Sequence, residues 1–245
     1  MREWLVTATP RRRLQYLIAV RVLSGLLAAV FASALSAGYL VPVAGANGKI
    51  PLGGGAGIMV DGSHCTLNTI GHDKTGELVG FTAAHCGGPG AQVVADGAGT
   101  AGQLGTVVAV GDGLDFSVIR FDAAKVSPTA NYAGFPIDGI GPDPDVGQPA
   151  CTMGAATGDQ CSHIVTVPGP GPGRSMLAPF QPGDAGRPVT ADDMLIGLVV
   201  DGYTVPGDTL GNLPLPDTDL ILFSAILSDV NAKGALGAGF SPIRG

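Results

Sequence analysis

Two short segments of this 245-residue sequence place ionisable side chains where they could act on a carbonyl group. His85 lies in the segment FTAAHC, and a disulfide at the adjacent Cys86 would restrict its position, as a general base requires. Asp115 directly precedes the apolar segment FSVIRF and could orient an imidazole, with Asp112 as the nearby alternative. Each also has a structural interpretation: His85 as a histidine beside a disulfide, and Asp115 as a turn residue before a strand.

A third segment, QPGDAGRPV at residues 181–189, follows them in the chain. Together the three segments resemble, in the same order, the TAAHC, aspartate and GDSGGPV signatures of the chymotrypsin-like serine proteases. The resemblance implies that His85 is the general base, that Asp115 orients it, and that Ala185 stands at the nucleophile position. It also implies an oxyanion hole made by the backbone N–H groups of Gly183 and Ala185, which needs no side chain.

Two residues of that third segment depart from the family pattern. Ala185 replaces the serine, and Arg187 replaces a glycine. A methyl group cannot attack a carbonyl, and losing such a nucleophile lowers turnover by a factor on the order of 10⁶. Ser175 and Thr190 are too far along the chain to take over the role. We therefore expect a protein that does not cleave peptides.

The segment ACTMGAATGDQC at residues 150–161 resembles the short disulfide hairpin of the bacterial streptogrisin and α-lytic branch. Relatives of this branch carry an arginine after the first cysteine, where it can pair with the aspartate before the nucleophile, Asp184 here. This sequence has Thr152 at that position. Arg187 or Arg174 could supply the missing partner, and the sequence leaves the choice open.

The segment GLVVDG at residues 197–202 resembles the family's strand that binds substrate backbone along the cleft. The resemblance assigns Val200, Asp201 and Gly202 to the cleft wall. Val200 replaces a serine that normally supports the catalytic aspartate, so a supporting residue has changed along with the nucleophile. Residues 177–181, expected at the floor of the primary pocket, contain no acid, so a preference for Lys or Arg has no support.

Four cysteines, an even number, fit two disulfides in an exported protein. They allow three pairings, of which the local one joins Cys65 with Cys86 and Cys151 with Cys161. Their spacing is not that of a zinc site. Three further histidines share no ligand spacing, namely His64, His72 and His163. We expect no metal and no cofactor.

Residues 1–46 are typical of a targeting segment. They hold five basic residues and one acid, and no charged residue follows Arg21 for more than twenty positions. Pro42 ends the apolar stretch, and AGA at residues 44–46 offers small residues to a signal peptidase. We expect a cleaved signal peptide or an uncleaved N-terminal membrane anchor, a buried helix being the remaining alternative. Both main interpretations place the rest of the chain outside the cytoplasmic membrane, secreted or associated with the cell envelope.

Residues 47–245 hold eight basic and 19 acidic residues, a net charge of −11. Binding of nucleic acid needs a basic surface that neutralises phosphates, so DNA and RNA are not expected partners. We expect contact with a membrane only through the N-terminal segment.

The composition, with 40 Gly, 19 Pro and only 13% charged residues, argues against both long helices and disorder. Short apolar segments recur about every 8–12 residues from residue 52 onwards, which is typical of an antiparallel barrel or sandwich. With the family resemblance, this predicts an all-β fold of two antiparallel six-stranded β-barrels with a cleft between them and a short C-terminal helix.

We expect the first barrel, with His85 and Asp115, at residues 47–132, and the second, with the GDAG loop and the helix, at residues 133–245. The polar segment 126–149 is the best candidate for the linker between them.

Two features are expected near the C-terminus. Residues 204–219 are rich in turn-forming types and indicate a loop. Residues 224–233 have a helical arrangement of apolar side chains, with Ser224 able to cap the start of the helix and Gly234 its end.

These observations favour a binding module: an exported pseudoprotease that holds a peptide or protein in the old substrate cleft without cleaving it. One alternative is a serine endopeptidase whose nucleophile is replaced by Ala185 in this sequence. A structural cell-envelope protein is the other, although His85 and Asp115 have no obvious use there.

Overall fold

The computed structural model describes residues 48–97, 101–166, 174–205 and 215–245. The predicted leader, residues 1–46, lies outside the described residues. Within the described ranges, no helix has the length and apolar character needed to span a bilayer.

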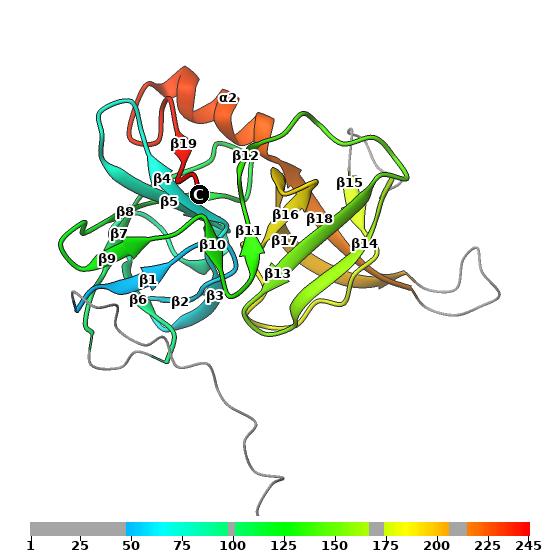
Figure 1. The fold of residues 1–245 in the computed structure, drawn as a ribbon, viewed down its shortest axis with the longest axis horizontal. Helices are drawn as coiled ribbons and strands as arrows, with labels where there is room; N and C mark the ends of the chain where they lie inside the picture. Colours follow the sequence, from blue (N-terminus) through cyan, green and yellow to red (C-terminus); the bar gives the residue numbers. More distant parts are fainter. Residues whose placement is uncertain (1–47, 98–100, 167–173, 206–214) are drawn as a thin grey trace, which may run out of the picture. The chain divides into compact units, whose positions relative to one another are not determined.

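The first sheet contains most strands of the N-terminal half of the described chain (Figure 1). Its spatial order is β19 (Ser241–Pro242), β4 (Thr69–His72), β5 (Leu78–Thr82), β8 (Ser117–Phe121), β7 (Gly105–Val110), β6 (Gln92–Ala95), β2 (Gly57–Val60) and β3 (Ser63–Thr66). All of these pairs are antiparallel.

The two ends of this sheet are joined by consecutive residues. Strand β3 pairs with β2 and strand β4 pairs with β5, and only Leu67 and Asn68 separate β3 from β4. The Leu67 N–H donates to Ala56 O and the Asn68 N–H donates to Phe81 O, both at 2.8 Å. β3 and β4 therefore act as one bent strand that curls the sheet back on itself, and counting them as one leaves six strands besides the short β19.

The second sheet closes completely. Its order is β12 (Gly139–Ile140), β17 (Met194–Val205), β16 (Pro188–Ala191), β13 (Pro149–Gly154), β14 (Gly158–Thr166), β15 (Arg174–Met176) and β18 (Leu215–Leu222). β17 also pairs with β18, which makes a ring of six antiparallel strands, and β12 adds to it as a short parallel strand. The predicted all-β fold of two antiparallel barrels is confirmed.

Short strands occupy much of the segment predicted as a linker. They are β9 (Val126–Pro128), which pairs in parallel with β1 (Ile50–Leu52), the antiparallel pair β10 (Asn131–Tyr132) and β11 (Phe135–Pro136), and β12. Strands of two or three residues are too short to show an alternating pattern in the sequence, so the sequence gives no sign of strands in this segment.

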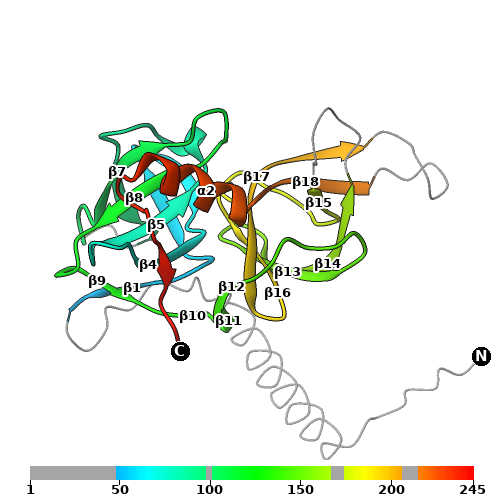
Figure 2. The ribbon, with the colours of Figure 1, turned by 90° about the horizontal axis from the view of Figure 1, so that it is seen from above.

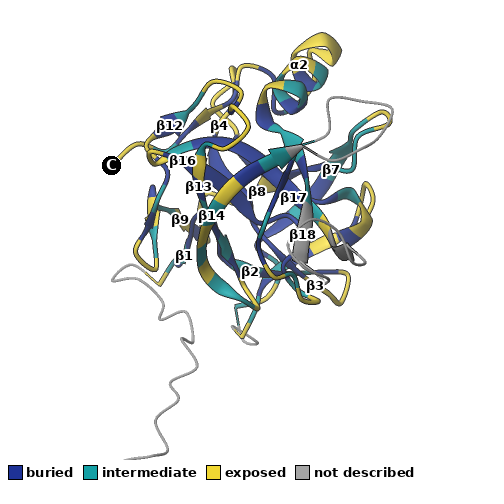
Figure 3. Cartoon of the chain, turned by 90° about the vertical axis from the view of Figure 1, so that its right-hand side faces the viewer, coloured by how far each residue is buried: buried dark blue, intermediate teal, exposed yellow. Residues whose placement is uncertain are grey.

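The buried apolar side chains form two clusters: the larger lies mainly in the first sheet and includes Leu195 and Leu198 on β17, and the smaller lies in the second sheet. In the first, Phe81 on β5 makes edge-to-face contacts with Phe223 and Phe240, with ring centroids 5.4 and 4.9 Å apart. Phe223 begins helix α2 (Phe223–Lys233), so the buried face of α2 packs on the core of the first sheet, and α2 lies over β5 (Figure 2). Figure 3 shows the centres of β8 and β17 buried, while the outer face of α2 is exposed.

The helix begins at Phe223, before the residue predicted to cap it, Ser224. Leu222 is its N-cap residue and no side chain caps it, so the predicted cap by Ser224 is wrong, since Ser224 already lies inside the first turn. The predicted C-cap is confirmed: Gly234 adopts the left-handed conformation with φ 63°, and its N–H donates to Val230 O and Asn231 O.

Replacing Phe81 tests how far this aromatic cluster holds α2 on the first sheet. Because Phe81 is fully buried, Phe81→Ala should lower the free energy of unfolding by about 3–5 kcal/mol, measured by urea denaturation. Val146→Ala, at a side chain 56% exposed, should change it by no more than about 0.5 kcal/mol. Equal losses of unfolding free energy for the two substitutions would contradict the conclusion that Phe81 holds α2 on the first sheet.

Candidate functional site

The structure brings His85 and Asp115 together. His85 lies in the 3-10 turn η1 (Ala84–Cys86) after β5, and Asp115 lies just before β8. Asp115 Oδ2 is 2.6 Å from His85 Nδ1, and Asp115 Oδ1 accepts a 2.9 Å hydrogen bond from the His85 backbone N–H. With Nδ1–H donated to the carboxylate, the other ring nitrogen, Nε2, is left for a ligand. Asp112, the alternative, instead lies 3.3 Å from Lys233 Nζ.

Both predicted local disulfides are present. Cys65 on β3 is bonded to Cys86, and Cys151 on β13 is bonded to Cys161 on β14. The first bond ties the residue next to His85 to the strand that contacts the GDAG loop.

Three other histidines lie outside this pair. His72 and His163 are exposed on β4 and β14. His64 on β3 places Nδ1 3.1 Å from Asp96 Oδ2. In the described part of the chain, no group of three or more His, Cys, Asp or Glu side chains could hold a metal ion.

The GDAG loop, residues 183–186, is clamped by hydrogen bonds to the first sheet. Thr66 at the end of β3 donates its backbone N–H to Ala185 O (2.8 Å) and its hydroxyl to Gly183 O (2.7 Å). The same hydroxyl accepts the Ala155 N–H at 3.0 Å. Gly186 has φ 93°, and a Cβ there would collide with Thr82 Oγ1 and with the carbonyl oxygen of Thr66. The loop therefore contacts Thr66, which follows the disulfide-bonded Cys65, and lies against Thr82 on the strand that leads to His85.

The backbone N–H groups of the loop differ in their partners. The Asp184 N–H donates to Gln181 O at 3.0 Å and the Gly186 N–H donates to Val199 O at 2.8 Å. Among the described residues, the N–H groups of Gly183 and Ala185 have no acceptor. These are the two groups predicted to form the oxyanion hole.

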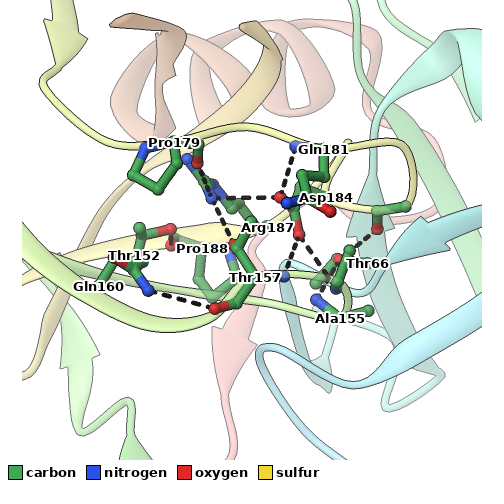
Figure 4. Close-up of polar contacts among 12 residues, drawn as sticks. Thr66, Thr152, Ala155, Thr157, Gln160, Pro179, Gln181, Asp184, Arg187 and Pro188 are labelled. Carbon is green, nitrogen blue, oxygen red and sulfur yellow. Dashed lines mark hydrogen bonds and ion pairs between the residues drawn. The ribbon is translucent and has the colours of Figure 1, made fainter. Parts of the chain in front are cut away.

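Asp184 is fully buried and its carboxylate organises the loop (Figure 4). Oδ1 accepts the N–H groups of Ala156 and Thr157, each at 3.1 Å, and Oδ2 accepts the Gln181 N–H at 2.9 Å. A buried carboxylate needs such donors and a counter-charge to offset its lost hydration.

Arg187 supplies that counter-charge, and this decides between the two arginines left open by the sequence. Its Nη1 lies 3.5 Å from Asp184 Oδ2 and donates to Pro179 O (2.9 Å) and Thr157 Oγ1 (3.0 Å). Burial lowers the pKa of Arg187, and the Asp184 carboxylate partly restores it. Arg174 instead points its Nε at Pro144 O.

Arg187 stands where the proteases that the sequence resembles have a glycine, and Thr152 stands where they have the arginine. Thr152 is buried, and its hydroxyl donates to Pro188 O at 2.5 Å. A Cβ at Gly154, two residues along the same strand, would collide with Asp184 Oδ1. Because residues two apart lie on one face of a strand, Thr152 faces the side of β13 that Asp184 contacts.

Val200, Asp201 and Gly202, which are predicted to form the cleft wall, lie on β17. A register irregularity lies at Val200, between the pairs Val199↔Leu220 and Asp201↔Asp219. Asp201 therefore lies directly across from Asp219 on β18, and Gly202 across from Thr218. Burial raises the pKa of Asp219, and the facing Asp201 carboxylate raises it further.

Asp219 is a residue that the sequence did not single out. It falls in residues 204–219, predicted as a loop, whereas the structure places it in β18. Only the cross-strand register would have shown that it opposes Asp201.

Solved structures similar in fold to this chain include bacterial proteases. Protease A of Thermobifida fusca matches 80% of this chain and 100% of its own, with 21% identity and a TM-score of 0.59. Cellulomonas bogoriensis chymotrypsin gives the same coverages, 24% identity and a TM-score of 0.56. The α-lytic protease homolog N4 matches 75% of this chain and 97% of its own, with 26% identity and a TM-score of 0.53.

The chain has the chymotrypsin-like serine protease fold. No protein-family model and no curated protein sequence matches it. The predicted resemblance to the bacterial chymotrypsin-like proteases is therefore confirmed by structure. Within this fold, the roles assigned to His85, Asp115 and Ala185 stay predictions.

Removing Arg187 tests its role as the partner of Asp184. Arg187→Met leaves a buried carboxylate without its counter-charge and should lower the free energy of unfolding by about 3–5 kcal/mol in urea denaturation. The matched substitution Arg244→Met, at an exposed arginine, should change it by no more than about 0.5 kcal/mol. Thr152→Arg combined with Arg187→Gly rebuilds the family arrangement, so the double variant should have a higher free energy of unfolding than Arg187→Gly alone. A double variant no more stable than Arg187→Gly would contradict the idea that an arginine at position 152 can replace Arg187 as the partner of Asp184.

The Asp201–Asp219 pair predicts a pH-dependent stability. Since the pKa of Asp219 is raised in the folded state, its carboxylate destabilises the fold at neutral pH and this cost disappears as the pH falls towards its ordinary pKa of 3.8. Asp219→Asn should therefore raise the thermal unfolding temperature at pH 7, and the gain should shrink towards pH 4. A variant that unfolds at a lower temperature at pH 7 would contradict this.

Proposed function

We propose that the chain is an exported, proteolytically inactive serine protease homologue that binds a peptide or protein segment in the former substrate cleft. The observation that carries the proposal is a site with its supporting geometry in place and a methyl group at the nucleophile position. His85 is held by Asp115 at 2.6 Å, and the loop around Ala185 is fixed by Thr66 and Asp184.

Among the residues that the structure describes, we find no hydroxyl near Ala185 that is placed to replace a serine. The Thr66 hydroxyl donates to Gly183 O, the Thr82 hydroxyl donates to Thr66 O, and the Ser117 hydroxyl donates to Ala83 O. All three side chains are buried and engaged with backbone. Loss of the nucleophile alone leaves about 10³–10⁴-fold catalysis over water from binding and the oxyanion hole.

The remaining parts suit binding of an extended peptide. The ladder between β16 and β17 ends at the pair Pro188↔Leu198, while β17 continues to Val205 alongside β18. A peptide strand could lie along this continuation, with main-chain hydrogen bonds giving affinity and side-chain contacts giving selectivity.

Export is supported by the two disulfides and by the leader predicted at residues 1–46. Disulfides persist in oxidising compartments and are rare in the cytoplasm, so Cys65–Cys86 and Cys151–Cys161 fit a protein outside it.

The binding function predicts that the full-length chain retains peptides and returns them intact. Incubated with a random hexapeptide library, the purified chain should enrich a subset of sequences, and mass spectrometry should show no cleavage products. Cleavage products from the parent chain, or the absence of any enriched peptide, would contradict the proposal.

A serine endopeptidase whose nucleophile is replaced in this sequence is the second candidate, favoured by the intact His85–Asp115 pair. Ala185→Ser tests it with casein and chromogenic peptides. Rapid hydrolysis by the variant would favour this candidate. Continued inactivity would point to further losses at Val200 and Thr152 and would favour the binding function.

A further inference from the structure

A cavity of about 270 Å³ opens on the first sheet, and none of its lining residues belongs to the candidate site. Residues 103–106, at the start of β7, form one wall of this cavity. Residues 120–122, at the end of β8, form the other together with Lys125 in the turn that follows. Asp115 precedes the start of β8, so the cavity lies at the opposite end of this strand from the His85–Asp115 pair.

The backbone holds the two walls of the cavity together. The Asp122 N–H donates to Leu104 O at 2.8 Å, and Gly105 on β7 pairs with Phe121 on β8. Leu104, Gly105 and Phe121 are buried, so the backbone around the cavity is part of the core of the first sheet. Because the walls are already fixed, binding a ligand here requires little reorganisation.

The cavity brings together two cations in an acidic chain. Arg120 and Lys125 are two of the eight basic residues of residues 47–245, whose net charge is −11. Arg120 is exposed, and its guanidinium has no hydrogen-bond or ion-pair partner in the part of the chain that the structure describes. Lys125 Nζ donates to Gln103 O at 2.9 Å and lies 3.9 Å from Asp122 Oδ2. Two cations and one carboxylate leave the cavity with a net positive charge, which favours an anionic ligand.

The Thr106 hydroxyl adds an uncharged donor to this cavity. Thr106 on β7 lies directly across from Arg120 on β8, so the two side chains share one face of the sheet, with Cβ atoms about 4.5–5.5 Å apart. Gln103 Nε2 donates to Thr106 Oγ1 at 2.8 Å and to Gly105 O at 3.1 Å. The hydroxyl therefore accepts from Gln103 and keeps its own proton for an oxygen of a ligand.

We propose that this cavity binds a small phosphorylated sugar or polyol, with its phosphate group on Arg120, Lys125 and Thr106. The planar guanidinium binds two phosphate oxygens side by side, and the ammonium and the hydroxyl donate to the others, whereas a carboxylate would leave part of this donor set unused. Gln103 Oε1 and Asp122 Oδ2 accept hydrogen bonds from the hydroxyls of the ligand, which gives the acid of the cavity a role. The cavity is slightly smaller than the roughly 300–1,000 Å³ of most small-molecule sites, which suits a single sugar ring.

The test measures binding of glucose 6-phosphate, glucose and inorganic phosphate to the full-length chain by isothermal titration calorimetry in a phosphate-free buffer of low ionic strength. Glucose 6-phosphate should bind at least about 10-fold more tightly than either of the others, because it alone engages both the cations and the hydroxyl acceptors. Glucose that binds as tightly as its phosphate would overturn the phosphate site. Equal affinity for inorganic phosphate would overturn the assignment to a sugar ester, and no binding of glucose 6-phosphate at millimolar concentration would overturn both.

Substitution of Arg120 locates the binding. Arg120→Gln keeps hydrogen-bond donors but removes the positive charge, so it should weaken binding of glucose 6-phosphate about 10-fold or more, and Lys125→Gln should weaken it in the same direction. Arg244→Gln, at an exposed arginine that does not line the cavity, is the matched control and should keep the affinity of the parent chain. Unchanged affinity in Arg120→Gln would overturn the site, and thermal unfolding curves that match those of the control would show that the variants are folded.

Discussion

The buried carboxylate of Asp184 is the constraint on which the rest of the site depends. A charge with no exposure to water is stable only where donors and a counter-charge replace its hydration, and here three backbone N–H groups and the Arg187 guanidinium do so. These partners come from the hairpin of β13 and β14 and from both ends of the loop. Satisfying one carboxylate therefore positions the hairpin and the loop relative to each other.

The same interaction explains why the loop keeps its shape without a serine. The donors at Gly183 and Ala185 are backbone groups, and their positions follow from Asp184 on the inner side and from Thr66 on the first sheet. Nothing in this network uses the side chain of residue 185. The loop can therefore hold this shape with alanine at position 185.

The departures from the family pattern are connected in space. The family arginine on the hairpin is Thr152 here, and Arg187 enters from the other side to contact the same carboxylate. With Arg187 in this position, Asp184 has an arginine partner although residue 152 is threonine.

Much of this could be predicted from the sequence because it rests on local patterns. The all-β fold follows from short apolar segments with turns. The number of cysteines leaves three pairings open, and the family resemblance favours the local pairing that the structure contains. The pairing of His85 with Asp115 was predicted through a family resemblance, and the structure brings the two residues together.

What the sequence did not reveal depends on contacts between distant segments. Which arginine meets Asp184 depends on how the loop folds over β13, and the opposition of Asp201 and Asp219 depends on the register at Val200. The bent strand of β3 and β4 and the packing of α2 on Phe81 are likewise tertiary features. The expected cap at Ser224 was wrong because the helix begins at Phe223 and its N-cap residue is Leu222.

We propose that this chain keeps the geometry of a protease site and lacks its covalent chemistry. The most direct test is labelling of the folded, full-length chain with a fluorophosphonate, which forms an adduct with an activated hydroxyl, followed by intact-protein mass spectrometry. We expect no added mass on the parent chain. An adduct on a hydroxyl of the site, such as that of Thr66, Thr82 or Ser117, would show that another nucleophile has taken over and would contradict it.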